Sequence, residues 1–368
     1  MLLLILIFTS CSKKEEPVII ELPEDSSEDI IPPPPVIELP SSDSEAETDT
    51  EPDSETDAEP DLTGLAVNSL TGLYINEEAA RQRPVAVVIN NLRKALPQSG
   101  ISQADIYYEV LSEADITRIV AVFRDFNSAK IGPVRSTRDY FLDFGLDMDA
   151  VFVHFGGSPA GYTFIKSNRI NNIDGITDGR TFWRDQARAS VPGMLEHSAY
   201  TSAERITQEI ERREYRTEVK ENYASFNFFD EQTPLDGATA VKKVTVPFSN
   251  SQSPVFEYNP ETSVFARSQQ GGAHIDEETG TQLEVTNIII QNASMKVVDN
   301  EGRRQVSLVT QGSGYLVTHG GYAPITWAKT SHDSPTKYYD TNGEEIKLNK
   351  GKTWICVFQD YGEVIFES

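Results

Sequence analysis

One stretch near the start of the chain has almost nothing to bury, and it limits which part of the sequence can fold. Residues 12–61 contain 18 of the 57 acidic residues and nine of the 20 prolines, against two lysines. Charge repulsion and proline keep such a segment extended. We therefore expect a disordered stalk that holds a folded body at a distance. An acidic tail that recruits a partner is the alternative.

The residues before this stalk, MLLLILIFTSC, form a short apolar run that ends at Cys11. Small residues before a cysteine are typical of a bacterial lipoprotein signal, and the run is shorter than the roughly 20 apolar residues that span a bilayer. We predict that residues 1–11 are a signal segment, that Cys11 is lipidated, and that the remainder is anchored at the cell membrane outside the cytoplasm. A chance apolar N-terminus is the alternative.

The body after the stalk is only mildly acidic. Residues 62–368 carry 39 acidic and 30 basic side chains, a net charge of −9 against −25 for the whole chain. No dense basic patch is present, so nucleic acid is not an expected partner. If Cys11 is acylated, Cys356 has no cysteine to pair with, and its apolar surroundings, KTWICVF, predict a core position. The sequence contains no P-loop, dinucleotide fingerprint or zinc spacing, and we expect no cofactor and no metal site.

Residues 62–222 mix strand and helix signals, which predicts an α/β (α+β) domain with a mixed sheet. Four apolar runs indicate strands with buried faces: 83–90, 105–112, 117–125 and 150–155. Three capping patterns predict helices that begin near Ser136, Ser158 and Thr201.

Residues 223–368 are predicted to form a mainly β domain, because short runs such as VKKVTVPF, PVFEY and TWICVF recur between turn signals. Asn342-Gly343 is the clearest hairpin signal. Trp327 and Trp354 lie near lysine and glycine, where they could stack on a sugar, contact a protein or fill the core. A His274–Asp276 pair lacks the third ligand that a metal site needs.

The densest polar cluster of the first half is the first candidate for a ligand site. It contributes Asn91, Arg93, Arg118, Arg135, Ser136 and Arg138. Guanidinium groups beside the free N–H groups of a helix that begins at Ser136 favour a carboxylate, a phosphate or a sugar acid. The alternative is structural, with Glu109, Glu113 and Asp139 pairing with the same arginines.

A second candidate follows the apolar run that ends at His154. Gly156 and Gly157 would let a ligand approach the backbone, and Ser158 would begin a helix whose N-terminus favours an anion. Ligands commonly lie beyond the carboxyl ends of strands in such sheets. A histidine that only completes local hydrogen bonds is the alternative for His154.

Four residues are candidate catalysts if the chain is an enzyme: Glu109, Glu113, His154 and His197. The two glutamates are four residues apart on one face of a predicted strand, and paired carboxylates serve glycoside hydrolysis. A histidine can act as acid or base. Asp174 and Arg184 lie in polar turns of the same half and could join the histidines if the fold brings them together.

These stretches also resemble the YerB-like lipoproteins, a bacterial family of unknown function. The matching segments of the first half are RPVAVVINN, LPQSGISQADIYYEVLSEADITRIVAVF, IGPVRSTRDYF, VFVHFGGSP and EHSAYTS. Those of the second half are GGAHIDEETG, TWAKTSHDSPTKYYD and GKTWICVF. The resemblance covers nearly all of residues 63–360. It implies two family domains on a lipid-anchored body, and it implies no reaction.

Together these observations predict a lipid-anchored surface protein that binds an anionic or glycan ligand at the cell envelope. A hydrolase acting on cell-wall glycan or a phosphodiester is one alternative. A protein-interaction scaffold, with the β-rich half as its contact surface, is the other. The expected partners are the membrane, through the N-terminal lipid, and a cell-wall polymer or an envelope protein.

Overall fold

The structure is a computed structural model that describes residues 61–220, 223 and 226–368. The predicted signal segment with Cys11, and the predicted stalk up to residue 60, lie outside the described residues, so both stay predictions. By its contacts the chain from Pro60 to Ser368 is one unit. None of its described helices is long and apolar enough to cross a bilayer.

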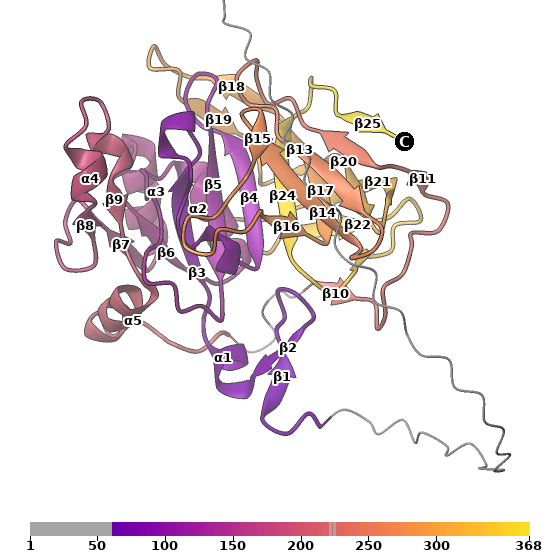
Figure 1. The fold of residues 1–368 in the computed structure, drawn as a ribbon, viewed down its shortest axis with the longest axis horizontal. Coiled ribbons are helices and arrows are strands. Elements are labelled where there is room, and N and C mark those ends of the chain that lie inside the picture. Colours follow the sequence, from indigo (N-terminus) through magenta and orange to yellow (C-terminus); the bar gives the residue numbers. More distant parts are fainter. Residues whose placement is uncertain (1–60, 221–222, 224–225) are drawn as a thin grey trace, which may run out of the picture. The chain divides into compact units, whose positions relative to one another are not determined.

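One mixed sheet of 11 strands runs through both halves of the described chain (Figure 1). The first half supplies β3 (Val85–Asn90), β4 (Ile106–Leu111), β5 (Thr117–Phe123), β6 (Val151–His154) and β7 (Asn172–Asp174). The second half supplies β11 (Thr239–Ala240), β17 (Asn287–Ala293), β20 (Gln311–Thr318), β21 (Gly321–Ala328), β22 (Lys337–Tyr339) and β24 (Thr353–Gln359). Across the sheet the order is β11-β21-β20-β17-β24-β4-β5-β3-β6-β7, and β22 pairs with β21.

The two halves meet inside this sheet at β24, which lies parallel to β17 on one side and to β4 on the other. Cys356 of β24 is opposite Ile290 of β17 and Glu109 of β4. All seven residues of β24 are buried, as expected for a strand covered on both faces. The predicted core position of Cys356 is confirmed.

A second sheet, built from the second half alone, packs on one face of the main sheet. Its strands are β12 (Lys243–Thr245), β13 (Val255–Asn259), β14 (Val264–Gln269), β15 (Gly272–Ala273), β16 (Glu284–Val285) and β25 (Ile365–Glu367). Aromatic rings join the two layers: Phe256 lies 5.8 Å from Trp354, and Phe366 stacks on Tyr322 at 3.9 Å between ring centroids. The second half is therefore mainly β, as predicted. Trp327 and Trp354 are both buried in the core, which is one of the three alternatives given for them above.

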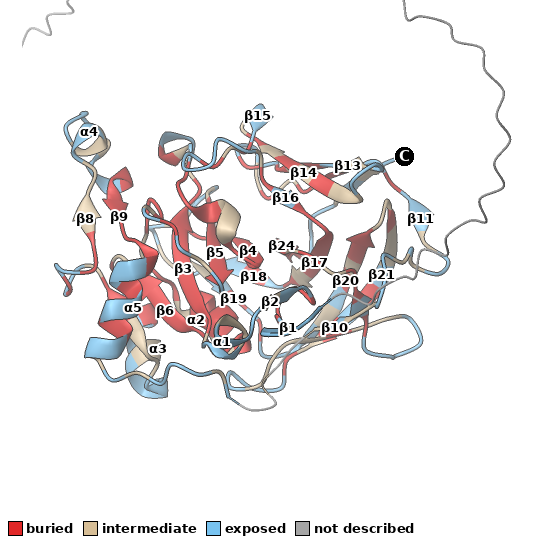
Figure 2. Ribbon diagram, turned by 60° about the horizontal axis from the view of Figure 1, so that its bottom comes forward, coloured by how far each residue is buried: buried red, intermediate tan, exposed pale blue. Residues whose placement is uncertain are grey.

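Helices cover the first-half strands on the face of the main sheet that lies opposite the second sheet. The residues of these strands are buried (Figure 2). The α-helices are α1 (Glu77–Arg81), α2 (Asp139–Asp147), α3 (Pro159–Asn168), α4 (Gln186–Ala189) and α5 (Ala203–Arg212), and the 3-10 turns are η1 (Arg93–Ala95), η2 (Ile101–Gln103) and η3 (Leu195–His197). Helix α2 packs against β3, β5 and β6. Because strand residues alternate between faces, Tyr108 stacks on Phe144 of α2 while Tyr107 stacks on Trp354, each at 4.5 Å.

Short strand pairs complete the described chain. β1 (Leu65–Val67) pairs with β2 (Tyr74–Asn76), β8 (Trp183–Arg184) with β9 (Ala199–Tyr200), β18 (Met295–Val297) with β19 (Arg304–Val306), and β10 (Asn227–Phe228) with β23 (Lys347–Leu348). The predicted Asn342-Gly343 hairpin is a turn closed by a single bridge between Tyr339 and Glu345.

The predicted helix starts had different outcomes. Ser158 caps α3 by accepting from the Gly161 N–H at 3.0 Å, as expected. The cap of α5 is Ser202, one residue after the predicted Thr201. The start at Ser136 was wrong, because α2 begins three residues later and the segment before it bonds to strands instead: the Arg135 N–H donates to Val88 O at 2.8 Å. No helix N-terminus is therefore available at Ser136 to bind an anion.

Candidate functional site

Four of the predicted ligand-binding residues line a hollow at one edge of the main sheet: Arg135, Ser136, Gly156 and Gly157. The hollow has a volume of about 360 Å³. It lies beyond the end of β6, which runs parallel to β3 and β7, so these strands end at the same edge. Ligands commonly bind at this position in α/β sheets. Its remaining walls are Val134, Phe155, Tyr162, Ile176, Arg184, Glu196 and Ala199.

The glycine turn after β6 brings the backbone to the wall of this hollow. Gly156 has a φ of +82°, a left-handed conformation that glycine adopts without strain. Its N–H donates to Asp174 Oδ1 at 2.8 Å, and Tyr162 donates its hydroxyl to the other oxygen of the same carboxylate at 2.8 Å. A Cβ on Gly156 would lie 3.1 Å from Ser136 Oγ, inside the hollow's wall. Asp174 therefore fixes both the turn and the phenol.

His154 supports this turn from beneath and does not line the hollow. Its Nδ1 lies 2.7 Å from Gly156 O, and because a carbonyl only accepts, Nδ1 carries the proton. Nε2 then accepts from Asn172 Nδ2 at 2.9 Å. The ring is fully buried, which lowers the pKa of His154 and keeps it neutral. We conclude that His154 positions the Gly156 carbonyl.

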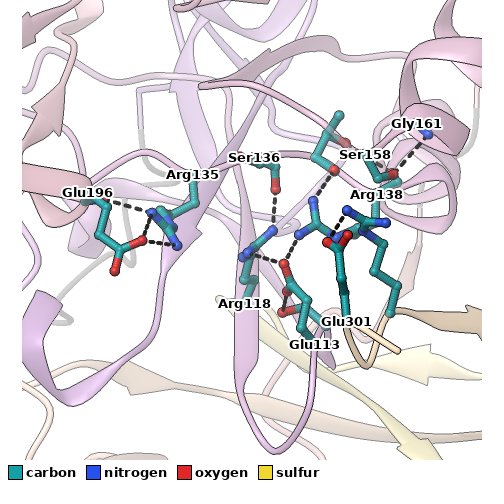
Figure 3. A network of polar contacts seen from close by, with 12 residues as sticks. Glu113, Arg118, Arg135, Ser136, Arg138, Ser158, Gly161, Glu196 and Glu301 are labelled. Atoms are coloured by element: carbon teal, nitrogen blue, oxygen red, sulfur yellow. Dashed lines mark hydrogen bonds and ion pairs between the residues drawn. The ribbon is translucent and has the colours of Figure 1, made fainter. Parts of the chain in front are cut away.

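Two arginines and one glutamate provide the charge of the hollow. Arg135 donates to Glu196 O at 2.9 Å and to Glu196 Oε2 at 3.2 Å (Figure 3). Arg184 donates to Leu195 O, and its guanidinium lies 4.6 Å over the ring of Phe155. No carboxylate contact of Arg184 is found among the described residues. Burial, and after it the positive charge of the nearby Arg135, lower the pKa of Arg184.

A second group of two arginines and one glutamate, the closed cluster of Glu113, Arg118 and Arg138, lies beside the hollow (Figure 3). Arg118 contacts Glu113 Oε1 at 2.8 Å and Ser136 O at 2.6 Å, and Arg138 forms an ion pair with the same Glu113 oxygen. The arginine side chains are only 3% and 7% exposed. For Arg118 and Arg138 the structure shows the ion-pairing alternative, and both guanidiniums already have their anion.

Glu109, proposed as a catalytic carboxylate, lies in the interior where the two halves meet. It is fully buried, and Arg267 of β14, also fully buried, donates to its Oε2 at 2.8 Å. Trp354 Nε1, Thr117 Oγ1 and Asn91 Nδ2 donate to the same carboxylate at 3.1, 2.9 and 2.9 Å. Glu109 and Asn91 thus belong to a buried network, away from the hollow.

The remaining predicted residues also have assigned places. Arg93 is exposed on η1 and is absent from the walls of the hollow. Ser158 caps α3. His197 is buried, and its Nδ1 accepts from Asn90 Nδ2 at 2.7 Å. Its Nε2 lies 3.6 Å from Glu196 Oε1, so it borders the hollow through that glutamate.

The possible metal ligands His274 and Asp276 serve different partners. His274 contacts Arg267 and Gln98, whereas Asp276 accepts from the backbone N–H groups of Gly100 and Ser102. Among the described residues, no group of three or more His, Cys, Asp or Glu side chains is placed to hold a metal ion.

Comparisons with known proteins agree on a family. The N-terminal domain of "Protein of unknown function (DUF3048)" matches residues 70–216, and its C-terminal domain matches residues 244–355. A protein from Bacillus subtilis (strain 168) named "Putative lipoprotein YerB" is 35% identical over 289 residues, which are 77% of this chain and 83% of that protein. The crystal structure of YerB from Bacillus subtilis matches with a TM-score of 0.72 and 32% identity, covering 82% of this chain and 99% of that one.

The chain belongs to the DUF3048 family. The resemblance to the YerB-like lipoproteins is therefore confirmed. All walls of the hollow, from Val134 to Ala199, fall in the N-terminal DUF3048 domain. The buried Glu109–Arg267 pair joins the two DUF3048 domains, since Arg267 lies in the C-terminal one.

The sequence patterns of this DUF3048 protein did not predict several residues that line the hollow: Phe155, Tyr162, Ile176 and Glu196. Phe155 immediately precedes the two glycines, and Tyr162 is one turn into the helix capped by Ser158, so both could have been assigned with the glycine turn. Ile176 lies in a turn and Glu196 on η3, and no local pattern indicates that these segments reach the site. Arg184 was named only as a residue of a polar turn, and the pairing of β8 with β9 places it here.

Proposed function

We propose that this chain is a lipid-anchored extracytoplasmic protein that binds an anionic group of an envelope glycan or polymer in the hollow. Arg135 and Arg184 hold the carboxylate or phosphate, and the Gly156-Gly157 turn lets it approach the backbone. The lipid anchor rests on Cys11 and on the name of the Bacillus subtilis relative, a lipoprotein.

One observation carries the proposal: two guanidiniums line an open hollow that contains a single carboxylate, and that carboxylate is exposed. The Glu196 side chain is 61% exposed and contacts Arg135, whereas Arg184 contacts one carbonyl oxygen, one hydroxyl and an aromatic ring. Arginine recognises carboxylate and phosphate through parallel N–H donors, and an incoming anion would relieve the repulsion between the two cations.

The experiment measures binding of the full-length chain to isolated cell-wall sacculi by co-sedimentation. Arg184→Gln should weaken the affinity for sacculi roughly tenfold, which is the loss expected for one charge-assisted contact. Arg93→Gln is the matched control, because Arg93 is an exposed arginine outside the hollow. Equal affinity of Arg184→Gln and of the parent chain for sacculi would contradict the proposal.

Hydrolysis is less well supported by the geometry. Its expected carboxylates, Glu109 and Glu113, each contact a buried arginine, and neither lines the hollow. The same sacculus preparation tests this alternative directly. Soluble fragments released by the parent chain, and not by Arg184→Gln, would favour a hydrolase at the hollow over a binding protein.

A further inference from the structure

A second cavity opens at the opposite edge of the main sheet from the hollow. It has a volume of about 520 Å³ and includes Val85 and Val151, the first residues of β3 and β6. Phe126 and Ile210 add apolar surface to its walls. This volume lies within the range of roughly 300–1,000 Å³ that is usual for small-molecule sites.

One buried guanidinium faces this cavity with its bonding incomplete. Arg124 is 4% exposed, and its Nη1 donates to Ala80 O at 2.6 Å. Among the described residues its Nε has no hydrogen-bond partner, and no carboxylate lies within ion-pair distance of its side chain. Asp105 and Asp149 act on the charge of Arg124 only from beyond ion-pair distance. A carboxylate that enters the cavity would add the direct contact that they do not make, and would therefore be favoured.

The other arginines of the cavity are already engaged. Arg83 donates to Asp149 O and to Asn171 Oδ1 at 2.5 and 2.7 Å. Arg216 pairs with Asp149 at 2.6 Å, and Arg81 pairs with Glu77 at 3.0 Å. Arg124 is therefore the cation that remains for a ligand among the arginines that line this cavity.

The same cavity also carries three glutamates beside the arginines that are already paired. Glu78, Glu211 and Glu218 are exposed lining residues, and no hydrogen bond or ion pair of their carboxylates is found in the described chain. A simple anion would be repelled by these three groups on its way to Arg124. A simple cation would be held by these glutamates and would leave the buried guanidinium without an anion.

We propose that this cavity binds a small zwitterion, an amino acid or a dipeptide. Its carboxylate faces Arg124, its ammonium group contacts the three glutamates, and its side chains lie against Phe126 and Ile210. The site is separate from the hollow and does not depend on the function proposed above.

The test is calorimetric titration of the full-length chain with the dipeptide Ala-Leu and two blocked analogues. N-acetyl-Ala-Leu lacks the ammonium charge and Ala-Leu amide lacks the carboxylate. Ala-Leu should bind, and each analogue should bind at least roughly tenfold more weakly, because each loses one charge-assisted contact. Absence of Ala-Leu binding, or equal binding of N-acetyl-Ala-Leu, would overturn the proposal.

Two variants on α5 locate the site. Glu211→Gln should weaken Ala-Leu several-fold, by roughly the value of one exposed charge pair. It should not weaken N-acetyl-Ala-Leu, which has no ammonium group and is repelled by the carboxylate of Glu211. Glu204→Gln is the control, because Glu204 is exposed on the same helix and outside the cavity.

Arg124→Met should abolish binding of Ala-Leu. If this variant does not fold, Glu211→Gln still tests whether Ala-Leu binds in this cavity. Unchanged Ala-Leu affinity in Glu211→Gln would exclude this cavity, and an effect of Arg184→Gln would point to the hollow instead.

Discussion

The hollow and the closed cluster each contain two arginines and one glutamate, but the arginines of the closed cluster are already neutralised, whereas those of the hollow are open to a ligand. In the closed cluster Glu113 is 21% exposed and contacts both Arg118 and Arg138. In the hollow Glu196 is 61% exposed and, of the two arginines, contacts only Arg135. The difference is therefore in the burial of the carboxylate and the number of cations that it neutralises.

This comparison teaches how a fold separates structural arginines from binding ones. Removing a charge from water is costly unless a counter-charge goes with it, so the buried pair of guanidiniums needs Glu113 at all times. Exposed pairs contribute little to stability and exchange readily for another partner. Arg135 and Arg184 can then accept a ligand without leaving a buried charge unpaired.

The largest expected effect is on the stability of the closed cluster. Glu113→Ala leaves Arg118 and Arg138 buried without a carboxylate, and we expect a loss of about 3 kcal/mol in the free energy of unfolding. Urea denaturation followed by circular dichroism measures it. Because the substitution damages the fold, it cannot distinguish a catalytic role of Glu113 from a structural one.

The matched substitution in the hollow is the control for this prediction. Glu196→Ala removes the same group from an exposed position, so the free energy of unfolding should change by less than about 1 kcal/mol. Equal losses for Glu113→Ala and Glu196→Ala would remove the distinction between the two clusters.

The next largest effect is a gain in binding affinity. Glu196 occupies Arg135 in the free protein, so Glu196→Ala should tighten binding to sacculi by roughly fivefold, equivalent to about 1 kcal/mol. Co-sedimentation at low and at moderate salt measures it, since screening reduces the advantage. Weaker binding in Glu196→Ala would show that this glutamate positions Arg135 for the ligand.

Sequence patterns predicted the individual strands well because each signal is local. The runs that became β3, β4, β5 and β6 are mostly apolar, and every residue in these strands is buried, as in strands covered on both faces. The partner of a strand is not local, and nothing in TWICVF indicates that β24 would lie between β17 and β4. The capping pattern at Ser136 failed for the same reason, because the backbone groups of this segment bond to β3 and to the turn that follows β6.

The candidate site was predicted in part for equally physical reasons. Gly156 and Gly157 after a buried strand indicated the edge of the sheet where the hollow lies. Arg118 and Arg135 could not be told apart, because no local pattern indicates that the first pairs with a partly buried Glu113 and the second with an exposed Glu196. Glu109 looked equally suited to catalysis until the fold placed it against Arg267, more than 150 residues away in sequence.

The smallest expected effect is a pH dependence that the hollow should show through His197 and that the closed cluster should not show. Burial lowers the pKa of His197, which borders Glu196. The unfolded chain therefore takes up a proton at higher pH than the folded protein does. The stability that neutral His197 provides is complete above its usual pKa of about 6.5 and is lost as the pH falls through the lowered value. His197→Gln should reduce the loss of unfolding free energy between about pH 7.5 and about pH 5 by about 1 kcal/mol or less.

Comparing the two chains at each pH isolates this contribution. Burial raises the pKa of Asp105 and of Asp143 to about 6, so these carboxylates act in the opposite direction, with stability rising as the pH falls through that range. Because both are present in the parent chain and in His197→Gln, they cancel in the difference. Parallel stability curves for the two chains would mean that His197 does not titrate with folding. The hollow would then resemble the closed cluster, whose arginines keep their charge across this range.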